Sequence, residues 1–238
     1  MSILKTKYPL VYQSRVAGLL YLFIIISGMF SEVAVRSNLI VPGDANTTVN
    51  NILENVWLFR VGFVSDAVML LSDVAIAVLF YVLLKSINKT LAISAAAFRL
   101  TQAAVLGFNL LNYYVALLLL NGTVYTNTFG AEQLNALVML FLEMHSHGYD
   151  IGLLFFGISC LILGYLVVKS HYFPKILGYG LVASGVVYLT GTLMQFLHPG
   201  YISIITPIYI IPLAAELSFC LWLLVKGARI QPEDLQIT

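Results

Sequence analysis

The chain has 238 residues, of which 60% are hydrophobic and 10% are charged, and its formal net charge is +1. Soluble domains carry about 25% charged residues, so this composition excludes a soluble globular protein. The sequence contains no basic block of the kind that binds nucleic acid, and we expect no nucleic-acid partner. The composition predicts an all-α, polytopic membrane protein whose first partner is the lipid bilayer.

Six apolar segments approach or exceed the length of about 20 residues that a helix needs to cross the hydrocarbon core. They cover approximately residues 14–35, 58–84, 90–120, 149–168, 174–198 and 205–225. We therefore predict a single domain over residues 1–238, a membrane bundle of six transmembrane helices with short interfacial helices on its outer side.

Basic residues flank the ends of the spans that we place in the cytoplasm, because cytoplasmic loops collect Lys and Arg. These residues are Lys5, Lys7, Arg15, Lys85, Lys89, Lys169, Lys175, Lys226 and Arg229. Both the N-terminus and the C-terminus are then expected in the cytoplasm.

The outer segment from Ser37 to Val56 contains Pro42-Gly43-Asp44 and then a polar stretch rich in Asn and Thr. Its apolar residues from Val49 onward have helical spacing. Asp44 precedes them and is of a residue type that caps helix N-termini. We expect a short interfacial helix that begins near Asp44.

The segment from Ala131 to Val168 is apolar for almost forty residues, which is too long for one straight crossing. We divide it at His145-Ser146-His147-Gly148, where we expect a bend. Residues 131–144 are then an outer interfacial or partly buried helix, and the fourth span follows the bend.

Nine charged residues lie inside apolar segments, where charge is costly and usually faces a bundle interior or a wet cavity. They are Arg36, Arg60, Arg99, Glu32, Asp66, Asp73, Glu143, Asp150 and Glu216. Three arginines against six acids require protonated acids, bound cations or a positively charged ligand.

Two pairs among these residues are predicted from spacing and depth. Glu32 and Arg36 are four residues apart with the acid first, which favours an ion pair on one helical face near the outer end of the first span. Arg99 and Asp73 lie at similar depth in neighbouring antiparallel spans, so we predict an ion pair between them. That pair is either the floor of a pocket or a strut between helices.

A polar pocket that opens outward is the main site predicted. Glu216 follows Pro212 by four residues, and a proline in a membrane helix frees carbonyls and can widen a cavity. Glu216 is therefore a candidate for the pocket wall. Alternatively, its carboxyl group forms a hydrogen bond to Ser218 or to a neighbouring helix. We expect the pocket to be lined by Asp66, Asp73, Arg99, Asn109, Asp150 and Glu216. The fourteen tyrosines receive no role, because many belong in aromatic belts.

A divalent metal such as zinc is a further hypothesis, based on the segment from Glu143 to Asp150. On a helix, Glu143, His147 and Asp150 share a face; in an extended bend, Glu143, His145 and His147 align instead. In either case, His198 and Glu216 are candidates for completing the ligand set. The segment matches no established metal motif, and hydrogen-bonded side chains at the outer rim are the alternative.

Several short stretches together have a familiar pattern. They include Arg15-Val-Ala-Gly-Leu-Leu-Tyr-Leu, Val41-Pro-Gly-Asp-Ala, Pro174-Lys-Ile-Leu-Gly178 and Leu221-Trp-Leu-Leu-Val-Lys-Gly227. In this combination the chain resembles, over nearly its whole length, a large bacterial family of six-span membrane proteins catalogued as a domain of unknown function. The resemblance implies the bacterial plasma (inner) membrane and a multi-pass topology. It implies no reaction, substrate or catalytic residue.

Three classes of function fit these observations. The first is binding or transport of a small molecule, a cation or a lipid headgroup in the outward pocket; the small size stands against a transporter, and a homodimer would compensate for it. The second is a membrane-embedded, metal-dependent hydrolase of a lipid-like substrate. The third is a structural or accessory membrane protein. We rank them in this order, and whether the protein is an enzyme stays open.

Overall fold

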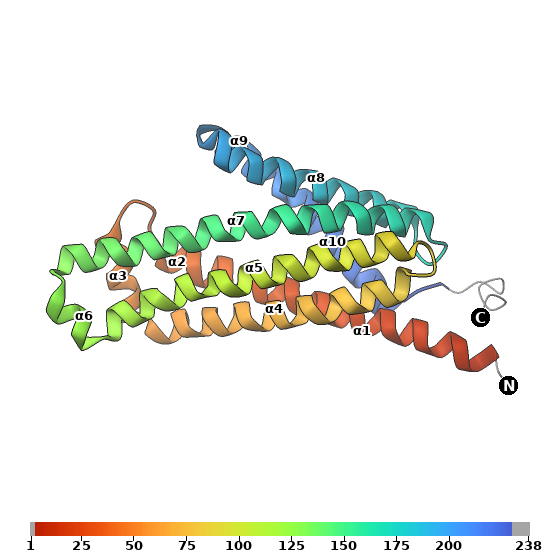
Figure 1. Ribbon diagram of the computed structural model, residues 1–238, viewed down its shortest axis with the longest axis horizontal. Helices are drawn as coiled ribbons and strands as arrows, with labels where there is room; N and C mark the ends of the chain where they lie inside the picture. The colour runs from red at the N-terminus through yellow and green to blue at the C-terminus, as the bar shows by residue number, and fades with distance from the viewer. Residues whose placement is uncertain (1–2, 230–238) are drawn as a thin grey trace. The chain divides into compact units, whose positions relative to one another are not determined.

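The computed structural model describes residues 3–229, and all the regular secondary structure in that range is helical (Figure 1). The elements are α1 (Ile3–Met29), the π-helix η1 (Phe30–Arg36), α2 (Ser37–Leu39), α3 (Ala45–Glu54), α4 (Val56–Leu84), α5 (Lys89–Asn121), α6 (Thr123–Thr128), α7 (Ala131–Lys169), α8 (Lys175–Leu197), the 3-10 helix η2 (Pro199–Tyr201), α9 (Ile202–Ile205), the 3-10 helix η3 (Thr206–Tyr209) and α10 (Ile210–Val225). The predicted all-α class is confirmed.

Six helical segments of the described residues are long and apolar enough to cross a membrane. They are Leu10–Leu39, Val56–Leu84, Lys89–Asn121, Ala131–Lys169, Lys175–Leu197 and Thr206–Val225. The protein is therefore a multi-pass integral membrane protein, as predicted. The two chain ends, to which we assigned the cytoplasmic side, lie outside the described residues.

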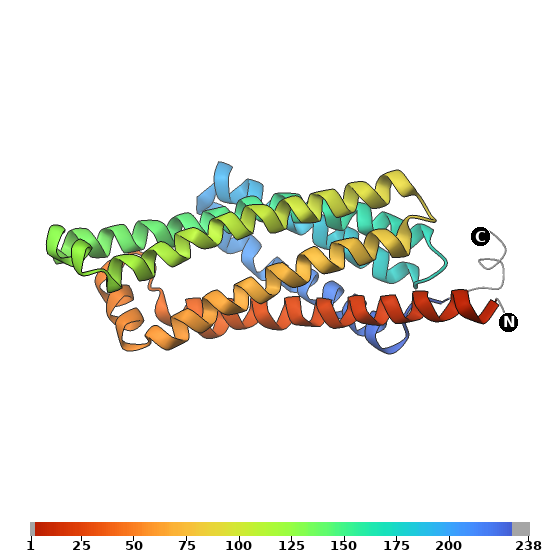
Figure 2. The same ribbon diagram turned by 60° about the horizontal axis from the view of Figure 1, so that its bottom comes forward.

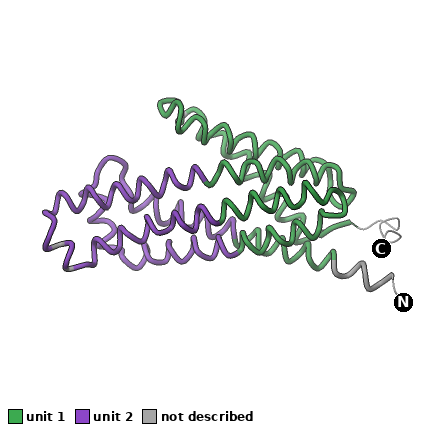
Figure 3. Tube along the Cα trace, in the orientation of Figure 1, with its two compact units in different colours: residues 1–23, 72–103, 152–238 green, residues 24–71, 104–151 purple. Residues whose placement is uncertain are grey.

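The chain forms two compact units, shown in different colours in Figure 3. Unit 1 consists of Met1–Phe23, Ser72–Ala103 and Gly152–Thr238, and unit 2 consists of Ile24–Leu71 and Ala104–Ile151. The helices α1, α4, α5 and α7 each contribute a part to either unit, whereas α8 and α10 belong to unit 1 alone.

The predicted bend at His145–Gly148 is wrong, because α7 is one continuous helix of 39 residues. At 1.5 Å per residue it is about 58 Å long, nearly twice the hydrocarbon thickness of about 30 Å. Only part of such a helix lies in hydrocarbon, so its length does not require a break. The segment also contains no proline, the residue that most strongly interrupts helices.

The predicted interfacial helix is α3, and a turn places it after the first span. Gly43 has φ 79°, and the Asp44 N–H donates to the Val41 carbonyl at 3.0 Å. Pro42 and Gly43 thus occupy the central positions of a type II turn, where the second residue needs a positive φ. The Asp44 carboxylate accepts bonds from the Thr47 N–H at 2.9 Å and the Thr47 hydroxyl at 2.7 Å, which caps α3 as predicted.

Glycines bring α7 and α8 together in unit 1. A Cβ added to Gly164 would lie 2.6 Å from the Gly178 carbonyl oxygen, and one added to Gly185 would lie 2.7 Å from that of Gly157. Both helices repeat a glycine after seven residues, so the two backbones touch twice along one face. Small residues stabilise such pairs because packing replaces the hydrophobic effect in a membrane.

The core of unit 2 is formed by buried residues of η1, α2, α3, α4, α5 and α7 (Figures 1 and 2). Two rings join α4 to α5 there. The rings of Phe59 and Tyr113 stack with their centroids 4.0 Å apart, and the Tyr113 hydroxyl donates to the Phe59 carbonyl at 2.9 Å. Val35, Ile52 and Val138 are fully buried in the same core. This packing fixes the helices that carry the polar residues described next.

Candidate functional site

The six residues predicted to line one pocket are divided between the two units. Asp66, Asn109 and Asp150 belong to unit 2, whereas Asp73, Arg99 and Glu216 belong to unit 1. Each unit has its own cluster of buried polar side chains.

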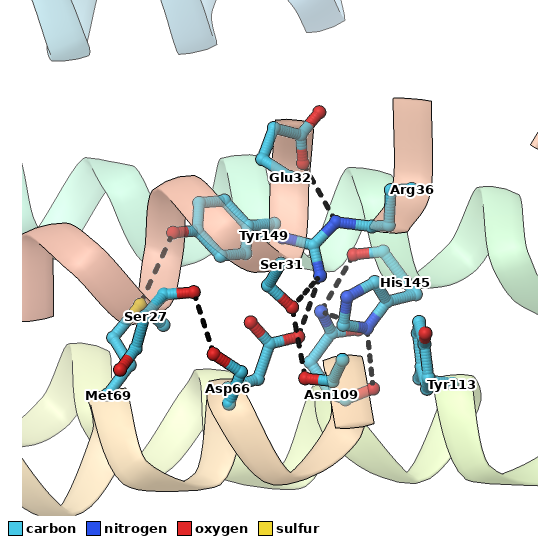
Figure 4. Close-up of polar contacts among 12 residues, drawn as sticks. Ser27, Ser31, Glu32, Arg36, Asp66, Met69, Asn109, Tyr113, His145 and Tyr149 are labelled. Carbon is cyan, nitrogen blue, oxygen red and sulfur yellow. Dashed lines mark hydrogen bonds and ion pairs between the residues drawn. The ribbon is translucent and has the colours of Figure 1, made fainter. Parts of the chain in front are cut away.

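Arg36 is the centre of the cluster in unit 2 (Figure 4). Its Nε donates to Glu32 Oε2 at 2.8 Å, and its Nη1 donates to Asp66 Oδ2 at 2.7 Å. The two acids differ in environment, because the Glu32 side chain is 63% exposed and the Asp66 side chain 4%. The pairing of Glu32 with Arg36 expected from their spacing is present, but Asp66 is the buried partner.

The π-helix η1 places Arg36 in this position. Arg36 Nη1 also donates to Ser31 Oγ at 3.2 Å, five residues earlier. In an α-helix, residues five apart point about 140° away from each other. The i→i+5 bonding of a π-helix widens the turn, so Ser31 and Glu32 both face Arg36. Such π segments often occur at functional sites.

Asn109 joins α5 to α7 in the same unit. Its Nδ2 donates to the His145 carbonyl at 2.7 Å and lies 3.3 Å from His145 Nδ1. The side chain fits because residue 148 is glycine: a Cβ there would overlap the Asn109 amide. His145 is 4% exposed, and Tyr113 lies edge-on to its ring.

A cavity of about 10 Å³ lies among these side chains. It is lined by Asp66, Met69, Leu70, Leu106, Asn109, Leu110, His145 and Tyr149. A volume of 10–15 Å³ holds about one water molecule. Two buried atoms of lining residues, Asp66 Oδ1 and His145 Nε2, have no hydrogen-bond partner. Buried polar atoms normally have one, so these two atoms mark a place for a small polar species.

The carboxylate and the imidazole in this cluster are groups that can exchange protons. A carboxylate oxygen accepts a proton, and the ring nitrogens of His145 can each hold or accept one. His145 Nδ1 lies 3.3 Å from both the Asn109 carbonyl oxygen and Asn109 Nδ2, so either tautomer finds a partner. His145 Nε2 can therefore carry a lone pair or an N–H without the loss of a hydrogen bond at Nδ1.

The predicted metal ligands are not assembled in the structure. Among the described residues, no group of three or more His, Cys, Asp and Glu side chains is arranged to hold a metal ion. His145 is buried, whereas Glu143, His147 and His198 are exposed. The extended alignment of Glu143, His145 and His147 is wrong, because α7 is continuous there and residues two apart on a helix face different sides.

Asp150 has a different neighbour. His147 Nδ1 lies 3.8 Å from Asp150 Oδ2, one helical turn along α7. Asp150 is half-buried and does not line the cavity. These two residues form a pair at the side of the cluster.

The cluster in unit 1 contains the predicted pair of Arg99 and Asp73. Arg99 Nη2 lies 2.6 Å from Asp73 Oδ1, and Gln102 Nε2 donates to Asp73 Oδ2 at 3.2 Å. Three rings surround the guanidinium, whose carbon lies 4.9, 5.4 and 5.8 Å from the ring centroids of Phe156, Tyr21 and Phe80. Aromatic faces stabilise a desolvated guanidinium.

Glu216 in α10 is bound by two tyrosines. The Tyr21 hydroxyl donates to Oε2 at 2.9 Å, and the Tyr188 hydroxyl donates to Oε1 at 2.6 Å. Of the two partners considered for Glu216, a neighbouring helix and Ser218, neighbouring helices supply the hydrogen bonds. The Ser218 hydroxyl donates to the Ala214 carbonyl instead. Tyr21 and Tyr188 were not predicted as partners of Glu216, because no spacing pattern separates them from the other tyrosines.

Comparisons with known proteins place the chain in a family. A family described as a domain of unknown function (DUF4386) matches residues 16–227, so the chain belongs to it, and the predicted resemblance is confirmed. An uncharacterized protein of Archaeoglobus fulgidus is 27% identical to the chain over 162 residues, which are 68% of this chain and 81% of that protein. No solved structure matches the chain.

Proposed function

We propose that this member of the family binds a proton at the cavity of unit 2, and that this binding is a step in the transport of protons across the membrane. The observation that carries the proposal is the pair of unpartnered buried atoms, Asp66 Oδ1 and His145 Nε2, at a cavity of about 10 Å³. A water molecule in that cavity would supply a hydrogen-bond partner to a buried polar atom that lacks one, and it can carry a proton to or from that atom.

The size of the cavity favours the proton over the other ligands that the sequence suggested. A lipid headgroup or a small organic molecule needs far more room than one water molecule. Metal cations such as Ca²⁺ take six or more oxygen ligands, and this cavity offers few. A proton needs only one acceptor atom, which the Asp66 carboxylate or the His145 ring can supply.

Charge supports the same conclusion. Arg36 carries one positive charge and contacts two acids, Glu32 and Asp66. With both acids ionised and His145 neutral, this group has an excess negative charge. Bound protons remove such charges, and Asp, Glu and His chains in pumps and transporters relay protons. The charge pattern of the loops predicts an orientation in which Asp66 lies toward the outer side.

Proton flux into liposomes tests the proposal. The full chain is reconstituted, a pH gradient is imposed, and a pH-sensitive dye inside the liposomes reports proton entry. We expect faster entry than into protein-free liposomes, and a loss of at least about tenfold in His145→Gln and in Asp66→Asn. His145→Gln leaves the ion pair of Arg36 and Asp66 intact, so its effect is not one of folding through that pair.

His171→Gln is the matched control, since His171 is exposed in the loop between α7 and α8. It should transport protons as the wild type does. Wild-type liposomes that take up protons no faster than protein-free ones would contradict the proposal. Equal loss in His145→Gln and His171→Gln would do the same.

A further inference from the structure

A second buried acid, Glu216 in unit 1, has partners that differ from those of every other buried carboxylate described above. We propose that Glu216 is a separate proton-binding site, held by the hydroxyls of Tyr21 and Tyr188. This inference concerns unit 1 alone and does not depend on the function proposed for unit 2.

The geometry around Glu216 satisfies both carboxylate oxygens. Oε2 accepts a bond from Tyr21 in α1 at 2.9 Å, and Oε1 accepts one from Tyr188 in α8 at 2.6 Å. Glu216 itself is 7% exposed. Its two partners come from different helices, so the carboxyl group is a point where α1, α8 and α10 meet.

Neutral partners distinguish Glu216 from Asp73, the other buried acid of unit 1. Asp73 contacts the Arg99 guanidinium at 2.6 Å, and this partner carries a positive charge and can only donate. Hydroxyl groups, in contrast, are both donors and acceptors. When Glu216 is ionised, both tyrosines donate to it. When it is protonated, its O–H donates to one tyrosine oxygen while the other tyrosine still donates.

The negative charge of an ionised Glu216 is not balanced by the charges of its neighbours. The titratable groups facing it are Tyr21 from α1, Asp73 from α4, Arg99 from α5, Cys160 from α7 and Tyr188 from α8. Arg99 and Asp73 neutralise each other, and the thiol and the phenols are neutral in their ordinary forms. An ionised Glu216 therefore gives the cluster a net negative charge inside a membrane span, which one proton removes.

The step is a simple addition. A proton from the aqueous phase adds to Oε1 or Oε2, one O–H bond forms, and no other covalent bond changes. Rotation of a tyrosine hydroxyl accommodates the new donor. Arg99 and Asp73 keep their contact in both states, so the change is confined to the three residues Tyr21, Tyr188 and Glu216.

Infrared difference spectroscopy of the full chain in lipid bilayers tests this site. Spectra at acid and alkaline pH are subtracted, and the C=O stretch of protonated carboxylic acids is followed. We expect one component that grows as the pH falls and is missing in Glu216→Gln. It should change frequency in both Tyr188→Phe and Tyr21→Phe, because one variant removes the hydrogen bond to the carbonyl and the other removes the acceptor of the acid O–H.

Two further variants make the assignment specific. The component should persist in Glu132→Gln, which alters an exposed acid, and in Asp66→Asn, which removes the carboxyl of unit 2. Retention in Asp66→Asn separates this site from the function proposed above. A spectrum without a component lost in Glu216→Gln, or a component that is the same at every pH, would overturn the inference.

If Glu216→Gln is not recovered from membranes, Tyr188→Phe decides the question by itself, since it keeps the carboxyl group. A pH-dependent component that shifts in frequency supports the site. A pH difference spectrum identical to that of the wild type overturns it.

Discussion

Arg36 has two carboxylate partners at similar distances, 2.8 Å to Glu32 and 2.7 Å to Asp66, but their burial differs. An exposed pair contributes about 0–1 kcal/mol, because water screens it. Removing one partner of a buried pair costs about 3–5 kcal/mol, because the other charge is left without compensation. Exposure therefore matters more than distance for the value of each contact.

We predict that Asp66→Asn lowers the free energy of unfolding by about 3 kcal/mol or more, and that Glu32→Gln lowers it by less than about 1 kcal/mol. Denaturant unfolding of both variants in the same detergent measures the difference. Replacing Arg36 and Asp66 together by apolar residues should restore part of the loss. Equal losses in the two single variants would show that Arg36 does not distinguish its partners.

Gly148 gives a second prediction for a single residue. In Gly148→Ala the new methyl group overlaps the Asn109 amide, so Asn109 must leave His145. Such overpacking typically costs about 1–3 kcal/mol. We expect lower stability and, since His145 loses its orientation, slower proton flux.

Gly107→Ala is the matched control, because it adds the same methyl group to a helix of the same unit. Its nearest neighbour would be Leu70 Cδ1 at 4.0 Å, an ordinary contact. Alanine is a better helix former than glycine by up to about 1 kcal/mol, so stability should stay equal or rise. Flux and unfolding that respond alike to both variants would contradict the role of Gly148.

Two local features of the helices, a π-helical turn and paired glycines, adapt them to their neighbours. The π-helix η1 turns Arg36 toward both Ser31 and Asp66, which a regular α-helix would not do. The paired glycines of α7 and α8 bring those two backbones into contact. The π-helical turn positions the charge of Arg36, whereas the glycines allow α7 and α8 to pack closely.

The cap of α3 is predicted to depend on pH. The pKa of Asp44 is lowered because the Thr47 N–H and hydroxyl bond to its ionised form. A depressed pKa in the folded state means that the stabilisation is present above the unfolded value, about 3.9, and is lost as the pH falls through the lower, folded value. Acidification should therefore loosen the first turn of α3.

Hydrogen–deuterium exchange of the α3 amides measures this effect. The ratio of exchange rates between Asp44→Asn and the wild type at each pH cancels the intrinsic pH dependence of exchange. Asn also caps helices but does not titrate there, so the wild type should exchange faster than the variant only at the acid end. A ratio that stays constant with pH would rule out a titrating cap.

At the scale of the whole molecule, the six spans follow from hydropathy and length alone. The ion pair of Arg99 and Asp73 was also predictable, because depth can be counted from the basic ends of adjacent spans. The contacts of Glu216 were not, since they depend on which of fourteen tyrosines face α10. The continuous α7 was missed because the length rule describes only the part of a helix that lies in hydrocarbon.

The residues of the cavity were likewise predictable only in part. Asp66 and Asn109 were predicted as pocket residues because they are polar groups in apolar segments, and both line it. His145 lines it as well, although its sequence context predicted a metal ligand. The π-helix at Phe30–Arg36 changes which residues share a face, and no residue in that segment predicts a π-helix. Helix type and side-chain neighbours therefore had to come from the structure.

The orientation of the spans in the membrane is the last prediction. Lys and Arg collect on the cytoplasmic side, and the loops 85–88 and 170–174 are flanked by lysines, whereas the connection 122–130 has no basic residue. A fluorescent reporter that matures only in the cytoplasm, fused after Thr238, should therefore fluoresce. The same reporter inserted between Asn127 and Gly130 should stay dark. The opposite result for the two fusions would reverse the topology, and it would place the Asp66 end of α4 toward the cytoplasm instead.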